Sequence, residues 1–196
     1  MLISNSVIKS KLSKYSDKNG KISRSIRNGE LKKLKRGLYE SGTDVPGYAL
    51  ASSLYGPSYL SFDFALFFYG MIPEKVVVYT SATFGKKKKK SFKTDFGEYT
   101  YRDVPEQIYY YGIQLGKVKD YYFQIATKEK ALCDKLYTLK PVKNIKEIYN
   151  LLVNDLRIDE DILLSLNFDE VEYIASKYHS TNVTMLLKLL RRLSHE

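Results

Sequence analysis

Basic charge is concentrated in the first 43 residues, and this uneven distribution constrains how the chain can fold. These residues include eleven lysines and arginines and three acidic residues, a net charge of +8, whereas residues 44–196 carry 21 basic and 19 acidic residues. A local excess of this size is typical of a phosphate-binding surface. The alternative is a solubilising tail, but apolar residues recur at structured spacing through the segment. The sequence therefore predicts a small basic unit followed by a larger unit of balanced charge.

The basic segment begins with the pattern of a short helix and a turn. Residues 5–15 place Val7, Ile8 and Leu12 on one helical face. Residues 16–20 are rich in Ser, Asp, Asn and Gly, which is typical of a turn. The apolar face predicts that this helix packs against the rest of the unit.

A second helix and a hairpin follow. The helix begins near Ile22 and points Ile22 and Ile26 inward, and Gly29 suits the left-handed position that ends it. Residues 31–35 and 38–40 then form a small β-hairpin. The order helix, turn, basic helix and basic hairpin is that of a winged helix-turn-helix. In such a unit the second helix enters the major groove of DNA and the hairpin follows the phosphates.

The polar side chains of the second helix and the hairpin are the candidate DNA contacts. Arginine binds guanine edges or phosphates, and serine and asparagine add hydrogen bonds. The alternative is a solvated helix face, but the neighbouring basic hairpin favours DNA. The predicted contacts are Lys21, Ser23, Arg24, Ser25, Arg27 and Asn28 in the helix and Lys33, Lys35 and Arg36 in the hairpin, with Arg36 at its tip.

The whole chain is predicted to be an α+β protein of two domains, at residues 1–43 and 44–196, joined by a linker over residues 41–47. In the second domain, about residues 44–140 combine helices with a small, mostly antiparallel central sheet, and residues 141–196 are helical. Helices are predicted at 48–54 and 61–69, from Thr127 to Pro141, and in three segments after residue 144. Strands are predicted at 75–80, 91–94, 98–103, 108–113 and 121–126.

Three segments, in order along the chain, resemble the motifs of AbiEi-type antitoxins. The first is the hairpin region from Gly29 to Tyr39. The second runs from Gly56 to Glu74 and contains GPSYLSFDFAL and YGMIPE. The third is IATKEKALCDKLY at residues 125–137. The segment FGEYTYR at residues 96–102, after a basic stretch, is also similar, so the resemblance covers roughly residues 20–140.

The resemblance implies a winged helix-turn-helix that represses the protein's own operon and an antitoxin domain. Such antitoxins belong to bicistronic, type IV toxin–antitoxin systems used in phage defence by abortive infection. The expected partners are operator DNA of the same operon and a nucleotidyltransferase toxin, without a stable complex between the two proteins. No enzymatic activity is expected. Two alternatives remain open: a winged-helix transcriptional regulator of another operon, and an RNA-binding or RNA-modifying protein.

A run of five lysines interrupts the second domain. It consists of Lys86, Lys87, Lys88, Lys89 and Lys90. Such a run is commonly a solvated loop. The functional interpretation is an additional nucleic-acid contact, either with operator DNA or with RNA.

The chain offers few groups for catalysis or metal binding. The single Cys133 and the two histidines exclude a disulfide framework, a cysteine-cluster zinc site and a multi-histidine centre. No metal or other cofactor is expected, and Cys133 is predicted to be a structural thiol. Glu129, Lys130 and Asp134 are residue types that metal nucleases use. Adjacent helical residues diverge by about 100°, so we instead expect Glu129 to favour the helix start and Lys130 to pair with Asp134 on the surface.

The sequence also predicts the location of the protein. The longest uncharged apolar stretch, residues 64–73, is shorter than the roughly 20 residues that a membrane helix needs. The N-terminus lacks a basic region followed by an apolar core. A cytoplasmic protein without a membrane partner is expected.

Overall fold

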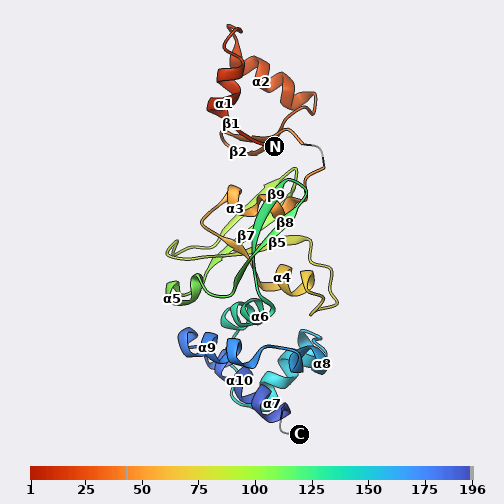
Figure 1. Cartoon of the computed structure of the whole chain (residues 1–196), viewed down its shortest axis with the longest axis vertical. Helices are drawn as coiled ribbons and strands as arrows, with labels where there is room; N and C mark the ends of the chain where they lie inside the picture. The colour runs from red at the N-terminus through yellow and green to blue at the C-terminus, as the bar shows by residue number, and fades with distance from the viewer. Residues whose placement is uncertain (43, 195–196) are drawn as a thin grey trace.

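The computed structural model describes residues 1–42 and 44–194. The chain is an α+β protein with a three-stranded antiparallel sheet, a six-stranded mixed sheet and a helical C-terminal part. Figure 1 shows these three parts following one another along the long axis of the molecule. Thr43, which falls in the predicted linker, and residues 195–196 lie outside the described ranges. Within those ranges, no helix is long and apolar enough to cross a membrane.

The N-terminal part contains the predicted helices and hairpin, together with a strand that was not predicted. Its elements are β1 (Leu2–Ser4), α1 (Asn5–Lys11), α2 (Lys18–Arg27), β2 (Lys32–Lys35) and β3 (Leu38–Glu40). Strand β3 lies between β1 and β2 and is antiparallel to both. Strand β1 is stabilised by pairing with β3, a segment far away in the sequence, so its local pattern does not reveal it.

The bounds of α2 follow from its capping residues. The Asp17 side chain accepts a hydrogen bond from the amide of Gly20 at 2.8 Å, so the helix begins several residues before the predicted start. Gly29 has a φ of 76°, which is the left-handed conformation expected after the helix. Ile22 is buried as predicted, whereas Ile26 is only half-buried.

The hairpin also attaches the N-terminal part to the rest of the chain. Leu34 is 3% exposed and belongs to the main hydrophobic core. The Lys35 ammonium donates to the carbonyl oxygens of Ser53 at 2.7 Å and Leu54 at 2.9 Å. The Lys32 ammonium lies 5.7 Å from the ring centroid of Phe96. The two predicted domains therefore share a packed contact around the hairpin.

The central sheet has the strand order β6-β7-β5-β4-β9-β8. Its strands are β4 (Tyr59–Leu60), β5 (Val78–Thr83), β6 (Lys90–Thr94), β7 (Gly97–Asp103), β8 (Ile113–Val118) and β9 (Tyr121–Ala126). The β5–β7 and β4–β9 pairings are parallel and the other three are antiparallel. The sheet is therefore larger and more mixed than predicted. The reason is β4, which has too few residues for a strand pattern yet joins the two halves of the sheet.

Two strand predictions need correction. The strand predicted at 75–80 begins instead at Val78 and continues to Thr83, and Val77 is exposed. The strand predicted at 108–113 is instead α5 (Glu106–Tyr109) followed by a turn, and the next strand begins at Ile113. Pro105 precedes α5, where a fixed φ and a missing amide suit a helix start.

The predicted helices around the sheet are confirmed. Residues 48–54 form the 3₁₀ segment η1 (Gly47–Leu50) and α3 (Ala51–Leu54), and α4 (Phe62–Phe68) follows β4. The buried Tyr99 and Tyr101 hydroxyls donate to the carbonyl oxygens of Gly47 and Ala51, both at 2.8 Å. These tyrosines therefore pack the sheet and hold η1 and α3 against it.

Helix α6 (Lys128–Tyr137) connects the sheet to the C-terminal helices, as Figure 1 shows. The Thr127 hydroxyl accepts from the amide of Lys130 at 3.2 Å, which confirms the predicted cap. Helix α6 contacts α4 and β9 on one side and α9 and α10 on the other. The C-terminal elements are α7 (Ile145–Tyr149), the π-helical segment η2 (Asn150–Asp155), α8 (Glu160–Leu164), α9 (Phe168–Tyr178) and α10 (Thr181–Leu193).

Candidate nucleic-acid interface and buried polar cluster

A hollow of about 590 Å³ lies between α2 and the basic hairpin. Among the predicted DNA contacts, Ser23, Lys33 and Arg36 line it. Ile22 and Ile26 of α2 line it as well, and so do residues of β3 and its preceding turn. The structure therefore brings polar groups of the helix and the hairpin together on one side of the N-terminal part.

The remaining predicted contacts on α2 are exposed or half-buried, and several have intramolecular partners. Lys21 lies 5.1 Å from the ring centroid of Tyr15. The Arg24 guanidinium is 4.0 Å from the Asp17 carboxylate, and both side chains are more than half exposed. The Ser25 hydroxyl donates to the carboxylate of Glu30 at 2.8 Å. Exposed pairs of this kind are weak, contributing about 0–1 kcal/mol, so Arg24 remains free to exchange partners.

Three predicted contacts carry charge without a partner. In the described part of the chain, the side chains of Arg27, Lys33 and Arg36 form no hydrogen bond, ion pair or ring contact. Lys35 differs, because its ammonium is held by the two carbonyl groups at the end of α3. Lys35 therefore contributes to the contact between the two parts of the chain, although the residue is exposed. Asn28 is exposed at the end of α2.

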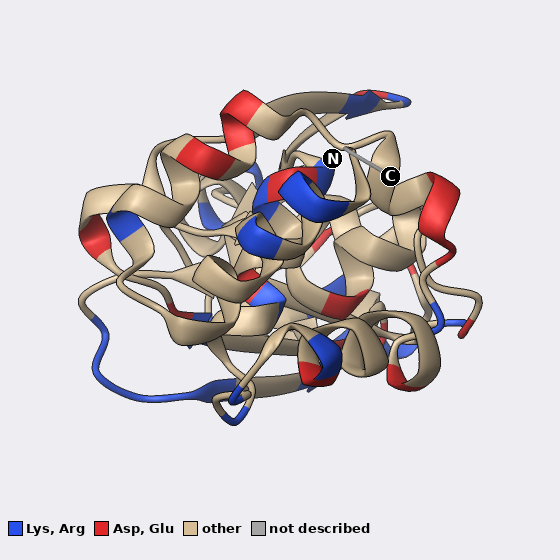
Figure 2. Cartoon of the chain, turned by 90° about the horizontal axis from the view of Figure 1, so that it is seen from below, with Lys and Arg blue, Asp and Glu red and all other residues tan. Residues whose placement is uncertain are grey.

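The lysine run lies at the periphery of the molecule, and its last residue, Lys90, is the first residue of β6. Figure 2 shows it as an uninterrupted basic stretch. The Lys86 ammonium donates to the carbonyl of Gly56 at 3.3 Å, and the amide of Lys87 donates to Asp103 at 2.6 Å. Lys87, Lys88, Lys89 and Lys90 are exposed. The contacts of Lys86 and Lys87 thus fix the position of the loop.

A closed polar cluster lies between the sheet and the C-terminal helices. We call it the Lys130–Asp134 cluster, and its members are Tyr59, Ser61, Lys130, Asp134 and Tyr178. The Lys130 and Asp134 side chains are 0% exposed and form an ion pair one helical turn apart. The Lys130 ammonium also donates to the hydroxyls of Tyr59 at 2.6 Å and Tyr178 at 3.1 Å. All three ammonium hydrogens therefore have acceptors.

The carboxylate of Asp134 is equally well satisfied. One oxygen accepts from Tyr59 at 2.9 Å and Ser61 at 2.6 Å, and the other accepts from Lys130 and Tyr178. Burial, together with the charge of Asp134, raises the pKa of the Tyr59 and Tyr178 hydroxyls well above the ordinary value. Both tyrosines therefore keep the protons that they donate.

The start of α4 is shaped by this cluster. Ser61 stands at the predicted N-cap, but its hydroxyl donates to Asp134 and makes no capping bond. The next residue, Phe62, has a φ of 56°, which is a strained conformation for a bulky side chain. At the start of α4, the hydrogen bond from Ser61 to Asp134 therefore takes the place of a capping bond, and Phe62 adopts a strained backbone conformation.

Glu129 is not a member of the Lys130–Asp134 cluster; it contacts the start of α9. Its carboxylate accepts from the amide of Asn167 at 2.8 Å, and the Asn167 side chain caps α9. The carboxylate of Glu170 accepts from the Thr127 hydroxyl at 2.6 Å. Burial raises the pKa of Glu170. Glu129 and Glu170 therefore connect the starts of α6 and α9.

These observations correct one prediction and confirm another. The Lys130–Asp134 pair forms with the predicted spacing, but it is buried rather than on the surface. Cys133 is buried, and burial raises the pKa of its thiol, which fits a structural role. Tyr59, Ser61 and Tyr178 were not predicted as partners of the pair. The available signal was that Tyr59 and Ser61 lie in the segment 56–74 and the pair lies in the segment 125–137, both of which were singled out from the sequence.

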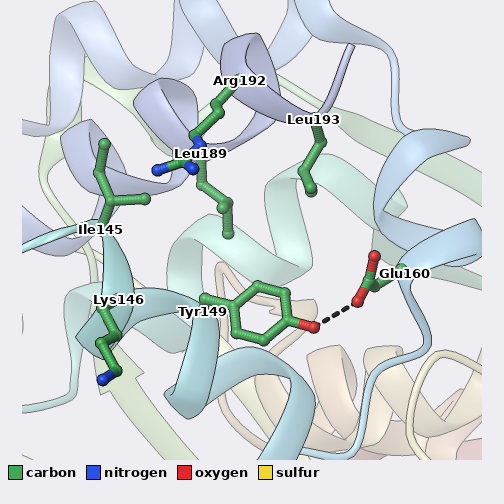
Figure 3. Close-up of a pocket in the computed structure, with 7 residues that line it drawn as sticks. All are labelled: Ile145, Lys146, Tyr149, Glu160, Leu189, Arg192 and Leu193. Carbon is green, nitrogen blue, oxygen red and sulfur yellow. Dashed lines mark hydrogen bonds between the residues drawn. The ribbon is translucent and has the colours of Figure 1, made fainter. Parts of the chain in front are cut away.

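A second cavity, of about 440 Å³, opens near the C-terminal end of the chain, and Figure 3 shows its walls. Three aliphatic side chains, Ile145, Leu189 and Leu193, line it together with Lys146, Tyr149, Glu160 and Arg192. A hydrogen bond to Glu160 raises the pKa of the Tyr149 hydroxyl.

In the part of the chain that the structure describes, no group of three or more His, Cys, Asp or Glu residues is placed to hold a metal ion.

Comparison of the sequence with protein-family models found no match, and comparison with curated proteins found none.

Proposed function

We propose that the protein is an AbiEi-like antitoxin that also binds the operator DNA of its own operon and represses transcription. The observation that carries this proposal is the hollow between α2 and the hairpin, which Lys33 and Arg36 line and where their side chains have no partner among the described residues. Cations on such a surface neutralise DNA phosphates and release the counterions condensed on the DNA, which favours binding.

The order of elements in the N-terminal part supports a winged helix-turn-helix. Helices α1 and α2 are joined by a short turn, and the hairpin β2–β3 follows. Strand β1 pairs with β3 and completes a three-stranded sheet. Helix α2 has ten residues, or about 15 Å of length, and a major groove about 12 Å wide admits a helix. In this arrangement α2 reads the groove and Arg36 at the hairpin turn follows the backbone.

The Lys130–Asp134 cluster supports the antitoxin resemblance of the second part. Two AbiEi-like motifs meet in this cluster through Tyr59 and Ser61 on one side and Lys130 and Asp134 on the other, in hydrogen-bonded pairs that lie 71 to 75 positions apart in the sequence. In the cluster, Tyr59 and Ser61 donate to the Asp134 carboxylate, and Lys130 pairs with that carboxylate and donates to Tyr59. The buried charges of one motif are therefore satisfied by hydroxyl groups of the other. On this proposal the functional partner is a nucleotidyltransferase toxin that forms no stable complex with the protein.

Binding to the promoter is expected to weaken steeply with salt. Each neutralised phosphate contributes a slope of about −0.9 to log K against log salt. Four or five such contacts would weaken binding by about 10²- to 10³-fold between about 50 and 200 mM salt. A gel-shift titration with the upstream DNA at two salt concentrations measures this. Salt-independent binding, or no binding to that DNA, contradicts the proposal.

The antitoxin activity is expected to reside in residues 44–196. This fragment should fold, because it holds nearly all of the main core, but it loses Leu34, whose burial contributes about 1.5–3 kcal/mol. We therefore expect a melting temperature several degrees lower, no DNA binding, and rescue of cells from the toxin encoded by the neighbouring gene. Thermal unfolding and growth on co-expression test this. A folded fragment that fails to rescue, while the full chain succeeds, contradicts the division of labour.

A further inference from the structure

A basic cavity of about 370 Å³ lies where the lysine run, strand β7 and the end of α6 meet. It is lined by Lys87, Lys88, Lys89, Arg102, Asp103 and Thr138. Arg102 and Thr138 also line a smaller, more enclosed cavity beside it, together with Lys135 and Asp63, which pair with each other at 2.6 Å. The basic cavity lies in the second part of the chain, apart from α2 and the hairpin.

The loop that forms one wall is held in place. One carboxylate oxygen of Asp103 accepts from the amide of Lys87, and the other accepts from the Thr83 hydroxyl, both at 2.6 Å. Lys86 is held by the carbonyl of Gly56 and lies 5.4 Å from the ring centroid of Tyr55. These contacts fix the backbone immediately before Lys88 and Lys89. This wall of the cavity therefore has a defined position.

The charges in the cavity are unbalanced. Four cations line it against one acid, Asp103, whose two oxygens already have donors. In the described part of the chain, the side chains of Lys88, Lys89 and Arg102 form no ion pair or hydrogen bond. Like charges gathered in a concave site focus the field and attract an anion. The excess of three positive charges exceeds the single charge of an internal phosphodiester and suits a terminal phosphate, which carries nearly two.

We propose that this cavity binds a terminal phosphate group, carried by a free nucleotide or by the 5′ end of an RNA strand. The planar guanidinium of Arg102 can bind two phosphate oxygens at once, and Lys88 and Lys89 act as point charges around them. The size of the cavity is within the range of small-ligand sites. This proposal goes beyond operator binding and does not depend on it, because none of these residues lies on α2 or the hairpin.

The test is calorimetric titration of the full chain with four probes. These are inorganic triphosphate, ATP, and one RNA decamer with either a 5′-phosphate or a 5′-hydroxyl end. We expect saturable binding of at least one phosphate-terminated probe and much weaker binding of the 5′-hydroxyl RNA. Binding of ATP or triphosphate alone assigns the site to free nucleotides, whereas binding of the 5′-phosphorylated RNA alone assigns it to RNA ends.

Two triple variants with the same change in net charge distinguish a site from diffuse attraction. The variant K88Q/K89Q/R102Q should weaken binding by about a thousandfold, because it removes three charged contacts and each is worth about tenfold or more. The control K143Q/K177Q/K188Q changes exposed lysines of the C-terminal part and should leave binding within about twofold. Equal weakening by both variants, equal binding of the two RNAs, or no saturable binding of any probe overturns the proposal. Melting curves of both variants confirm that they fold.

Discussion

Replacement of Asp134 by leucine is expected to lower the free energy of unfolding by about 3–5 kcal/mol, because it leaves the Lys130 ammonium buried without its counterion. The change also removes the acceptor of the Tyr59, Ser61 and Tyr178 hydroxyls. For a chain of this size, the loss corresponds to a fall in melting temperature of about 6–20 °C. Denaturant titration and thermal melting measure it.

Replacement of Lys130 by methionine should be less damaging than the loss of Asp134. Asp134 then keeps three hydroxyl donors, from Tyr59, Ser61 and Tyr178, and a carboxylate with several hydrogen bonds is still well stabilised. The double variant K130M/D134L removes both charges and should be more stable than D134L alone. This order of stabilities separates a buried charge effect from a simple packing defect.

A matched control lies on the same helix. Lys135 pairs with Asp63, but these side chains are 17% and 37% exposed. Replacement of Lys135 by methionine should therefore destabilise the protein less than D134L, because water still reaches the Asp63 carboxylate that is left without its partner. If K135M destabilises the protein as much as D134L, or if D134L leaves the melting temperature unchanged, the stabilising role of the Lys130–Asp134 cluster is refuted.

The double substitution R24A/R27A is expected to abolish most of the operator affinity while leaving the fold intact. Both side chains are exposed on α2, and Arg24 has only a weak pair with Asp17. A lost bidentate base contact costs about 1–3 kcal/mol, so two such losses weaken binding about thirtyfold or more. A promoter reporter should be derepressed, and antitoxicity should persist.

The control for this experiment is K143A/K188A, which removes the same charge from exposed positions of the C-terminal part. It should repress normally. Melting curves of both variants should agree with that of the unchanged protein within about 2 °C, because exposed side chains contribute little to folding. A stable R24A/R27A variant that represses fully would show that the basic surface of α2 does not contact the operator.

Local pattern was sufficient for elements whose signals are short-range. The two N-terminal helices, the hairpin and the Thr127 cap of α6 follow from apolar spacing and from capping residues within a few positions of each helix end. The i, i+4 spacing likewise predicted that Lys130 and Asp134 would pair. These features depend on neighbours in the sequence, so the sequence contains the information directly.

Long-range pairing determined the strands that the pattern missed. Strand β1 exists because β3 lies beside it, and β4 exists because it lies between β5 and β9. The same reason applies to Lys35, which was predicted as a DNA contact on the basic hairpin. Its ammonium also donates to two carbonyl groups of a segment 18 and 19 residues away, which no local pattern indicates.

The burial of the Lys130–Asp134 pair shows most clearly what sequence pattern leaves open. Ala131, Leu132 and Cys133 are consecutive and span about 200° of α6, so the pattern indicates a wide apolar side. It does not indicate whether the remaining side faces water or another layer. In the folded chain α6 lies between the sheet and α9, and the charged pair is enclosed. Tyr59 from β4 and Tyr178 from α9 reach it from opposite layers, because enclosed charges require partners that only the packing of distant segments can supply.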